Sequence, residues 1–467
     1  MRIADIARYI FLTYCVACLV MVNFTGVEPE TLLILMKIFV VFAFVNFIFA
    51  LGTYVCFFDL LILMGAMQWF YANIWLRENM PILAFRPVNH FYATFFTYTS
   101  LLAIVLLSFR PSLLHEKTKD LISKVAKIEN LDSFGKFFFY TGFIFSFIKD
   151  FVGNLPTIGQ LMHVFSQFGY VSMICFIFSK SKRKGVYISF MLLWTLYICI
   201  RSTLFWPIIF WSLFFFIIYS IRHKVTFFFK LSLVGVGIVL VIFVQSFKQQ
   251  LRAETSFRPE YLQQGSGSFT AFSDLANQRL SSLGTGADVN KLFLGTFFMR
   301  MNQAMWDNWS ISRVDQSGNF LDGESVYKAA IGAFIPRVFW PDKPKFDNSL
   351  LTRLTGSKIN AFISISILAE AYVNFKFLGG AVFVILYGLL LRGYYNLILR
   401  WSYRRSVLYF IFFPFLFFTF TRTEVDFVQT IYSMVSSTIT LLGMFIFMQR
   451  FNLFNIRKTK YALLSEK

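Results

Sequence analysis

The chain has 467 residues and a formal net charge of +20; 57% of its residues are hydrophobic, 20% are aromatic and 15% are charged. Soluble globular domains are about 45–50% apolar and about 25% charged, so this composition excludes an ordinary soluble protein. Apolar runs recur along almost the whole chain, and a run such as 32–51 can cross about 30 Å of hydrocarbon as a helix. The sequence therefore predicts an all-α polytopic membrane protein.

Twelve apolar runs are predicted to span the membrane. In chain order they are 4–23, 31–50, 56–76, 88–109, 136–149, 156–179, 185–200, 203–221, 226–247, 377–399, 405–421 and 427–449. The first run lacks a cleavage site of small residues, so we expect it to stay in the protein as a helix. The runs divide the chain into an N-terminal membrane bundle of about nine spans (1–247), one large loop (248–376), and a C-terminal bundle of about three spans with a short basic tail (377–467).

Lys and Arg residues sort between the two sides of the predicted membrane domain. One set of connections, which begins with Arg2 and Arg8, carries 24 of the 44 Lys and Arg residues, whereas the short loops opposite carry five. Cytoplasmic loops hold the excess of basic residues in membrane proteins. Both termini are therefore predicted to be cytoplasmic, and 248–376 is predicted to be the one large extracytoplasmic loop. Because topology accounts for the basic excess, we expect the lipid bilayer as a partner and no nucleic acid.

All five cysteines lie inside apolar runs. Two of them, Cys15 and Cys18, have the C-x-x-C spacing of a metal site, but inside a membrane helix this spacing indicates packing residues. The same placement disfavours a disulfide framework. The sequence thus predicts neither a metal site nor a cofactor.

The segment 248–376 begins with a Gly- and Ser-rich stretch at 265–268, which is typical of a flexible loop. Aromatic and apolar runs at 293–305 and 326–339 predict short helices that pack on the membrane domain. Residues 361–376 are predicted to form an amphipathic or re-entrant helix that leads into the tenth span.

Four basic residues stand at the outer membrane boundary, against the usual distribution of charge. Lys248 and Arg252 follow the ninth span four residues apart, so a continuing helix places them on one face. Arg201 lies between the seventh and eighth spans, and Arg422 between the eleventh and twelfth. Such side chains either reach to the interface or pair with a carboxylate, or they converge to bind a pyrophosphate, for which the planar fork of Arg is suited. Both interpretations stay open at this point.

The segment 334–344 reads Phe-Ile-Pro-Arg-Val-Phe-Trp-Pro-Asp-Lys-Pro. Its three prolines prevent a helix, and Trp340 is suited to anchor it at the membrane interface. Arg337 and Lys343 are thereby expected on a stiff loop that faces the membrane surface. A turn with a purely structural role is the alternative.

This segment resembles the signature of bacterial O-antigen and exopolysaccharide repeat-unit polymerases of the Wzy type. Two flanking stretches are similar to the same family: 245–252, which leaves the membrane with a Lys-x-x-x-Arg pair, and 369–379, which contains Glu370 and Tyr372 in an Ala-Glu-x-Tyr-x-Asn-Phe pattern. The resemblance covers roughly 245–380, and the remainder is similar only in its predicted topology.

The resemblance implies a membrane glycosyltransferase of the GT-C-like type in the bacterial cytoplasmic (inner) membrane, working without a metal. Such enzymes transfer a growing glycan from undecaprenyl pyrophosphate to the non-reducing end of an incoming lipid-linked repeat unit at the outer leaflet. A chain-length regulator and a flippase are further implied partners. The departing pyrophosphate needs cations, and the weakly acidic acceptor hydroxyl gains from a positioned carboxylate.

The residues expected to carry this chemistry fall into three groups. Glu370 is the leading candidate for the general base, followed by Asp322 and Glu324, with Glu424 and Asp426 as a further acidic pair. Candidates for binding the pyrophosphate and the glycan are Arg201, Lys248, Arg252, Arg337, Lys343, Arg422, Trp340 and Tyr372.

Two other functions compete with the polymerase. An O-antigen ligase is expected to carry a catalytic His in its large outer loop, but 248–376 contains no His; His90 and His163 are the two nearest the outer side. A flippase for lipid-linked oligosaccharide should line a path with charges, but few ionisable residues lie in the predicted spans. They include Lys37 and His163, and Asp59 and Arg392 near the cytoplasmic ends of their spans. The polymerase is therefore favoured.

Overall fold

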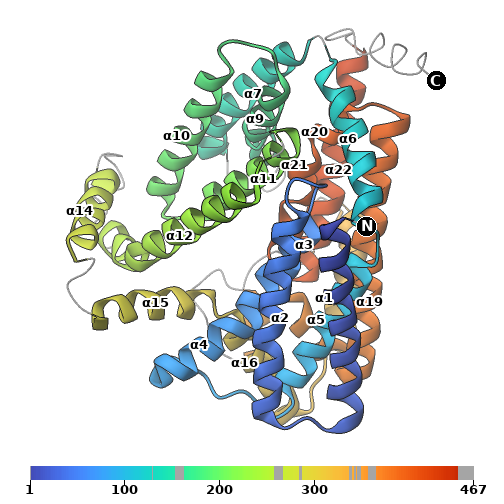
Figure 1. Ribbon diagram of the computed structural model, residues 1–467. Coiled ribbons are helices and arrows are strands. Elements are labelled where there is room, and N and C mark those ends of the chain that lie inside the picture. Colours follow the sequence, from blue (N-terminus) through green and yellow to red (C-terminus); the bar gives the residue numbers. More distant parts are fainter. Residues whose placement is uncertain are drawn as a thin grey trace.

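The computed structural model describes residues 2–128, 130–152, 162–223, 225–256, 267–282, 287–335, 339–340, 343, 349–355 and 364–450. All regular secondary structure within these ranges is helical (Figure 1). The predicted all-α architecture is confirmed.

Eight helices are long and apolar enough to cross a membrane, counting only the described residues. They are α1 (Ile3–Val20) with its π-helical end η1 (Met21–Thr25), α2 (Pro29–Ala50), the continuous unit of α3 (Phe57–Gly65), η2 (Ala66–Tyr71) and α4 (Ala72–Asn79), α10 (Lys184–Ser202), α11 (Trp206–His223), α12 (Phe227–Ser256), α19 (Ile367–Arg404) and α22 (Phe427–Arg450). A ninth is present if α5 (Phe91–Leu107) and α6 (Pro111–Ala126), which meet at a bend of 53°, form one span. A multi-pass membrane protein is confirmed, and the count of twelve spans stays a prediction.

Three of the predicted spans have a different form in the structure. The run 136–149 lies within the longer α7 (Leu131–Val152), and 156–179 contains the short α9 (Phe168–Phe178). The run 405–421 is broken into α20 (Leu408–Ile411), α21 (Phe413–Phe417) and the 3-10 turn η4 (Thr419–Thr421). Pro414 contributes to this break, because its ring has no N–H to donate to the preceding turn.

The segment 248–376 forms a series of short helices that pack on the membrane helices. They are α14 (Gly267–Ser282), α15 (Ala287–Met301), α16 (Gln303–Ser317), α17 (Glu324–Phe334) and α18 (Ser349–Thr355). The helix α15 contacts α4 and α12, while α16 packs against α19 and α17 against α22 (Figure 1). This packing brings the loop helices to the end of the bundle at which α19 and α22 begin.

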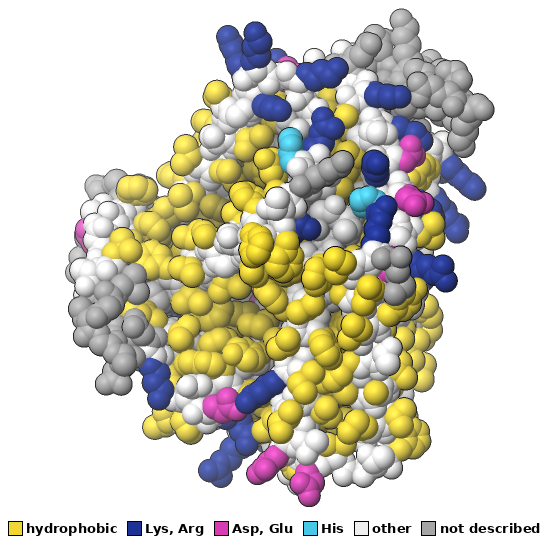
Figure 2. All heavy atoms as spheres, in the orientation of Figure 1, with side chains coloured by type: hydrophobic (Ala, Val, Ile, Leu, Met, Phe, Trp, Pro, Cys, Tyr) yellow, Lys and Arg dark blue, Asp and Glu magenta, His cyan; other side chains and the backbone are white. Residues whose placement is uncertain are grey.

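Aromatic side chains fill the core between these helices. The ring of Phe39 contacts those of Phe11, Phe70 and Phe96, which joins α1, α2, η2 and α5. In contrast, no residue from Phe227 to Gln245 of α12 is buried inside the protein. Figure 2 shows a broad apolar flank, with Lys and Arg side chains gathered at the end where α6 and α7 lie in Figure 1. The apolar flank is therefore suited to contact lipid.

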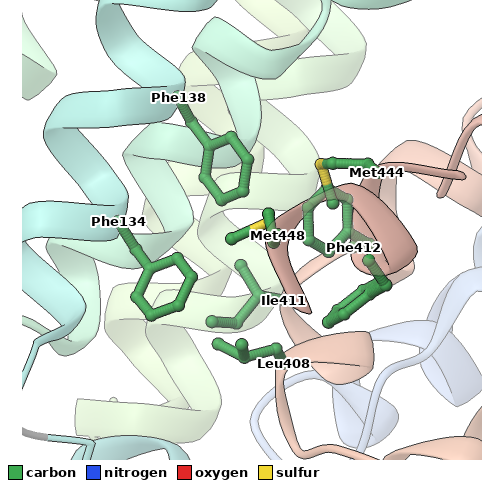
Figure 3. A pocket seen from close by; sticks show the side chains of 8 residues that line it. Phe134, Phe138, Leu408, Ile411, Phe412, Met444 and Met448 are labelled. Carbon is green, nitrogen blue, oxygen red and sulfur yellow. The ribbon is translucent and has the colours of Figure 1, made fainter. Parts of the chain in front are cut away.

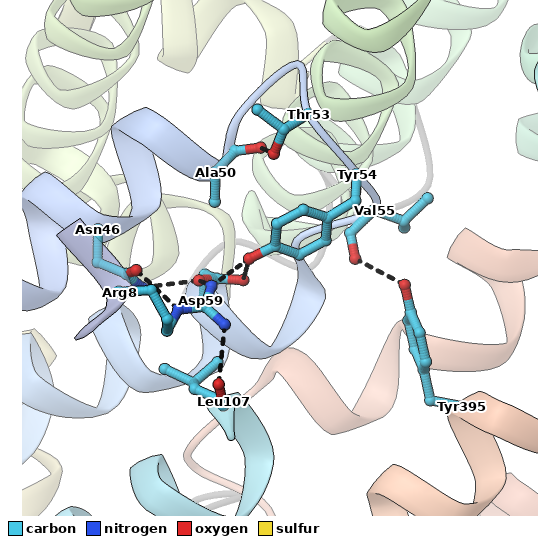
Figure 4. A network of polar contacts seen from close by, with 9 residues as sticks. All are labelled: Arg8, Asn46, Ala50, Thr53, Tyr54, Val55, Asp59, Leu107 and Tyr395. Carbon is cyan, nitrogen blue, oxygen red and sulfur yellow. Dashed lines mark hydrogen bonds and ion pairs between the residues drawn. The ribbon is translucent and has the colours of Figure 1, made fainter. Parts of the chain in front are cut away.

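A buried ion pair ties the N-terminal helices together (Figure 4). Arg8 of α1 and Asp59 of α3 form an ion pair in which neither side chain is exposed. Asn46 accepts from Arg8 Nε at 2.9 Å and donates to Asp59 at 2.7 Å, and Tyr54 donates to Asp59 at 2.7 Å. Arg8 also donates to the carbonyl of Leu107 at 3.2 Å. We refer to Arg8, Asn46, Tyr54 and Asp59 as the arginine network.

The position of Arg8 differs from the one assumed when Lys and Arg residues were assigned to the two sides of the membrane. The sequence groups it with the basic residues that flank the first span, but it lies inside α1 and is fully buried. A buried guanidinium needs a carboxylate and several acceptors, and these come from α2, α3 and the end of α5. Asp59 lies in a predicted span and requires a cation, and this requirement could have predicted that Arg8 is buried beside it.

Candidate functional site

Glu370 lies in the first turn of α19 and is fully buried. Its Oε1 accepts a hydrogen bond from the Ser325 hydroxyl of α17 at 2.5 Å, and its Oε2 accepts one from the backbone N–H of Phe427 at 2.6 Å. Phe427 is the first residue of α22, and the N–H groups of a first helical turn have no partner within the helix. A carboxylate at this place is also favoured by the helix dipole. Glu370 therefore joins the starts of three helices.

Asp426 caps the same helix from the residue before it. Its Oδ1 accepts from the N–H of Gln429 at 2.8 Å, which is the usual N-cap arrangement, and its Oδ2 accepts from the Ser364 hydroxyl at 2.8 Å. The two predicted acids Glu370 and Asp426 thus meet at the beginning of α22. Their nearness could not be read from positions 56 residues apart.

The hydrogen bonds continue to a third carboxyl group, Asp307 of α16. Gln303 donates from its Nε2 to the carbonyl of Ser364 at 2.8 Å and to Asp307 Oδ1 at 3.2 Å. The N–H of Ser366, the residue before α19, also donates to Asp307 Oδ1, at 2.8 Å. We refer to Asp307, Glu370 and Asp426, with the side chains of Gln303, Ser325, Ser364 and Asn374 that bind them, as the acid network.

Asp307 was not selected from the sequence, although it has the most distinctive environment of the three. It is fully buried, and its Oδ2 has no hydrogen-bond partner within the described residues. Burial raises the pKa of Asp307 to about 7. A carboxyl group of this kind changes its protonation state near neutral pH. Its flanking residues carry no pattern that separates it from a surface aspartate, so only the tertiary structure identifies it.

A second group of side chains surrounds the same end of α19 but reaches the surface. The Tyr372 hydroxyl donates to Asp315 Oδ1 of α16 at 2.9 Å, and His90 Nε2, just before α5, is 3.2 Å from Asp315 Oδ2. The imidazole ring of His90 stacks on the Tyr372 ring with centroids 5.3 Å apart. Beside them, the Phe320 ring is 6.2 Å from Tyr372, and the Lys376 ammonium lies 4.8 Å from the centre of Phe320. We refer to these five residues as the rim cluster.

Lys376 of the rim cluster has an unusual backbone. Its φ of 57° and ψ of −166° interrupt α19 in a region that only glycine enters readily. The Tyr98 hydroxyl of α5 supports the break by hydrogen bonds to the carbonyls of Lys376 and Phe377, at 3.0 and 2.8 Å. Strain of this kind costs about 1–3 kcal/mol and collects at functional sites. The break turns the Lys376 side chain outwards, where it is exposed.

Two more of the predicted acids, Asp322 and Glu324, have separate surroundings. Asp322 is exposed on the turn before α17, with a φ of 46°. Glu324 forms ion pairs with Lys328 at 2.5 Å and with Arg353 at 3.1 Å. Hydrogen bonding from Lys328, aided by Arg353, keeps the pKa of Glu324 below its ordinary value. Neither acid joins the acid network, although Ser325, next to Glu324, does.

Two of the predicted cations border the beginning of α22. Arg422 donates to Glu424 at 3.1 Å and lies 4.8 Å above the ring of Trp206 in α11. Lys343 donates to the carbonyl of Ile335 at 3.1 Å, and its ammonium is 4.3 Å from the ring centre of Tyr432 in α22. Glu370 and Lys343 therefore contact α22, through Phe427 and Tyr432. Arg422 lies in the segment just before this helix.

The remaining predicted cations lie elsewhere or outside the description. Arg201 is exposed at the end of α10, and Lys248 is half-buried in α12. The helix ends that carry them pack around the apolar cluster of Cys199, Phe205 and Leu251. The side chain of Arg252 and the whole of Arg337 lie outside the described residues, and Trp340 is half-buried. Convergence of all six cations stays a prediction.

Two further observations concern other kinds of site. A pocket between α7, α20 and α22 is lined by Phe, Leu, Ile and Met side chains alone (Figure 3). It has no group that could transfer a proton or bind a charge. Among the residues that the structure describes, no three His, Cys, Asp or Glu side chains are arranged to hold a metal ion.

Comparisons of the chain with protein-family models, with curated proteins and with solved structures found no match. The motif resemblance over 245–380 therefore stays a prediction from the sequence. Of its segment 334–344, the structure describes residues 334, 335, 339, 340 and 343. The family assignment stays a prediction.

Proposed function

We propose that the protein is a polymerase of lipid-linked oligosaccharide repeat units. It transfers the growing glycan from undecaprenyl pyrophosphate to the non-reducing end of an incoming lipid-linked unit, at the outer leaflet of a bacterial cytoplasmic membrane. In this proposal the chain crosses the membrane about twelve times with both termini in the cytoplasm. A chain-length regulator and a flippase are its proposed partners.

The observation that carries this proposal is the packing of α16 and α17 on the starts of α19 and α22. It supports an active site at one end of the membrane helices, where carboxylates, cations and aromatic rings of the segment resembling the polymerases come together. Lys343 and Arg422 are placed there to stabilise charge on a departing pyrophosphate, because such charge is stabilised best by cations already in position. In this proposal Arg337 and Arg252 complete that cationic surface.

The arrangement of charges inside the spans supports an enzyme over a transporter. Arg8 is paired with Asp59, and Lys37 of α2 is 2.5 Å from Glu78 of α4. Arg392 of α19 donates to the carbonyl of Val105 at 3.0 Å. Each of these charges holds two helices together, whereas a translocation path needs charged groups that face a continuous opening.

A strain that lacks the protein separates the candidate functions by what accumulates on the lipid carrier. Loss of a polymerase should leave single repeat units on undecaprenyl pyrophosphate at the outer leaflet. Loss of a ligase should leave long polymer on the carrier, and loss of a flippase should leave single units at the inner leaflet. Extracted carrier lipids, sized by mass spectrometry and tested for access to an external glycosidase, distinguish the three; either of the last two patterns would reject the proposal.

Arg337 provides a test of the cationic surface in the complemented strain. The Arg337→Lys variant keeps the charge but loses the bidentate fork, so we expect it to lose the ladder of polymer lengths nearly as completely as Arg337→Ala. A Lys variant with a normal ladder at normal abundance in the membrane would remove Arg337 from pyrophosphate binding. Arg183→Lys, on the basic connection before α10, is the matched control and should leave the ladder unchanged.

A further inference from the structure

The proposed reaction needs a base that the acceptor sugar can reach, and the candidate acids differ in this respect. Both oxygens of Glu370 are occupied and the residue is fully buried. Both ion pairs of Glu324 are to its Oε1, and hydrogen bonding from Lys328 keeps its pKa below the ordinary value. A hydroxyl on an incoming substrate therefore does not reach Glu370 without a rearrangement of its neighbours, and Glu324 is a weak base.

His90 of the rim cluster meets this requirement as it stands. Its side chain is 44% exposed, and its Nε2 lies 3.2 Å from Asp315 Oδ2. When Nε2 donates its proton to the carboxylate, the lone pair of the imidazole is on Nδ1. Within the described residues Nδ1 has no hydrogen-bond partner, so it is available to a substrate.

Asp315 is itself fixed in place. Its second oxygen accepts the hydroxyl of Tyr372 at 2.9 Å, and the Tyr372 ring stacks on His90. The segment that carries His90 is tied to α16 as well, because the N–H of Val88 donates to Asn308 at 2.9 Å. A carboxylate beside a histidine that acts as a base is also the arrangement used in nucleophilic hydrolases.

The strained residue of α19 provides a second, independent indication. Lys376 lies beside Phe320 in the rim cluster, is in no ion pair among the described residues, and has the backbone conformation described above. The half-buried ring of Phe320 suits the apolar face of a sugar, and the exposed ammonium group of Lys376 suits a phosphate. Base, cation and aromatic surface thus lie side by side at the end of the bundle where α19 begins.

We propose that His90, oriented by Asp315, is the general base of the glycosyl transfer; this inference rests on the proposed function. The acceptor hydroxyl gives its proton to His90 Nδ1 as its oxygen forms the new bond to the anomeric carbon of the growing glycan. The bond from that carbon to the phosphate oxygen breaks, and its electron pair leaves with undecaprenyl pyrophosphate. The imidazolium returns its proton to water. Asp315 and Tyr372 are positioning residues for His90, and Glu370 positions the beginning of α22.

The experiment uses membranes from the deletion strain complemented with each variant. The substrate is the lipid-linked repeat unit extracted from the deletion strain without complementation. The product is the ladder of polymer lengths. His90→Gln should lower the rate of polymerisation by about 10²-fold or more, which is the usual contribution of a general base. The matched control is His223→Gln, which changes an exposed histidine at the end of α11 and should leave the rate unchanged.

Chemical rescue separates a catalytic role from a structural one. His90→Ala leaves space beside Asp315, so added imidazole should restore a measurable part of the rate in this variant and none in Arg337→Ala. Asp315→Asn should lower the rate less than His90→Gln while leaving the amount of folded protein unchanged. Absence of polymer from the wild-type protein would reject the proposed function. Normal polymerisation by a well-folded His90→Gln, or failure of imidazole to rescue His90→Ala, would reject this inference alone.

Discussion

The arginine network and the acid network both bury several polar groups, but they differ in how charge is balanced. In the first, the charge of Arg8 is met by Asp59, and the remaining hydrogen-bonding groups are met by Asn46, Tyr54 and a backbone carbonyl. In the second, the partners that Glu370 and Asp307 have are neutral hydroxyl, amide and backbone N–H groups. Neither of these two acids is in an ion pair within the described part of the chain.

This difference in charge balance determines how each network responds to pH. The opposite charges of Arg8 and Asp59 offset each other, so the arginine network fastens α1, α2, α3 and α5 together. Carboxyl groups that are held by neutral donors cost much more to ionise when buried. The acid network therefore couples the packing of α16, α17, α19 and α22 to the protonation of its members.

The largest expected effect comes from breaking the compensated pair. Asp59→Asn leaves the Arg8 guanidinium buried without its counter-charge, which typically costs about 3–5 kcal/mol of stability. We expect little folded protein by size exclusion and a much lower unfolding temperature in detergent. The double variant Arg8→Met with Asp59→Leu should regain most of the loss, because an apolar pair of similar volume replaces the ion pair. If Asp59→Asn is as stable as the wild type, the buried Arg8 does not need Asp59 as its counter-charge.

The acid network should reveal itself through pH. Because the pKa of Asp307 rises from 3.8 to about 7 on folding, its contribution to stability is complete below about pH 4 and is lost as the pH rises to about 7. The loss amounts to at most about 4 kcal/mol. Asp307→Asn stays neutral, so its unfolding temperature should exceed that of the wild type at pH 8 and not at pH 5.

A surface acid is the control for the Asp307 measurement. Asp120 has a side chain that is 45% exposed and pairs with Lys124. The difference between Asp120→Asn and the wild type should therefore be the same at pH 5 and pH 8. If the difference between Asp307→Asn and the wild type is equally independent of pH, Asp307 is ionised in the folded protein throughout this range.

A smaller effect is expected from Glu370→Gln, in which an amide N–H₂ group replaces one accepting oxygen. Glu370→Gln removes one of the two oxygens, so that either Ser325 or Phe427 loses its partner, at a cost of about 1–3 kcal/mol. We expect a moderately lower unfolding temperature together with loss of polymer. Glu324→Gln, which breaks partly exposed ion pairs, should cost only about 0–1 kcal/mol. Equal losses of stability in Glu370→Gln and Glu324→Gln would show that the buried hydrogen bonds of Glu370 contribute no more to the free energy of unfolding than an exposed ion pair does.

The sequence predicted the helical architecture because long apolar runs have no other stable form in lipid, and α2 and α22 lie close to the predicted ranges. It did not predict the breaks in 405–421, since these depend on how a short aromatic segment packs between α19 and α22. Glu370 was selected by its motif, but its burial could not be read from the sequence. Asp307, His90 and Asp315 were missed as a site because their partners are up to 282 positions away, as between His90 and Tyr372.

The exposed helix α12 has a consequence for how the protein responds to its membrane. Most of its apolar stretch is exposed, apart from contacts such as those of Phe227 with Phe49 and of Lys230 with the Leu51 carbonyl, and α12 also contacts α14 and α15. The tilt of such a helix depends on the match between its hydrophobic length and the bilayer thickness. A thinner or thicker bilayer should therefore change the tilt of α12 and displace α14, which packs on it. Lipid composition would then change the position of the loop helices through the tilt of α12.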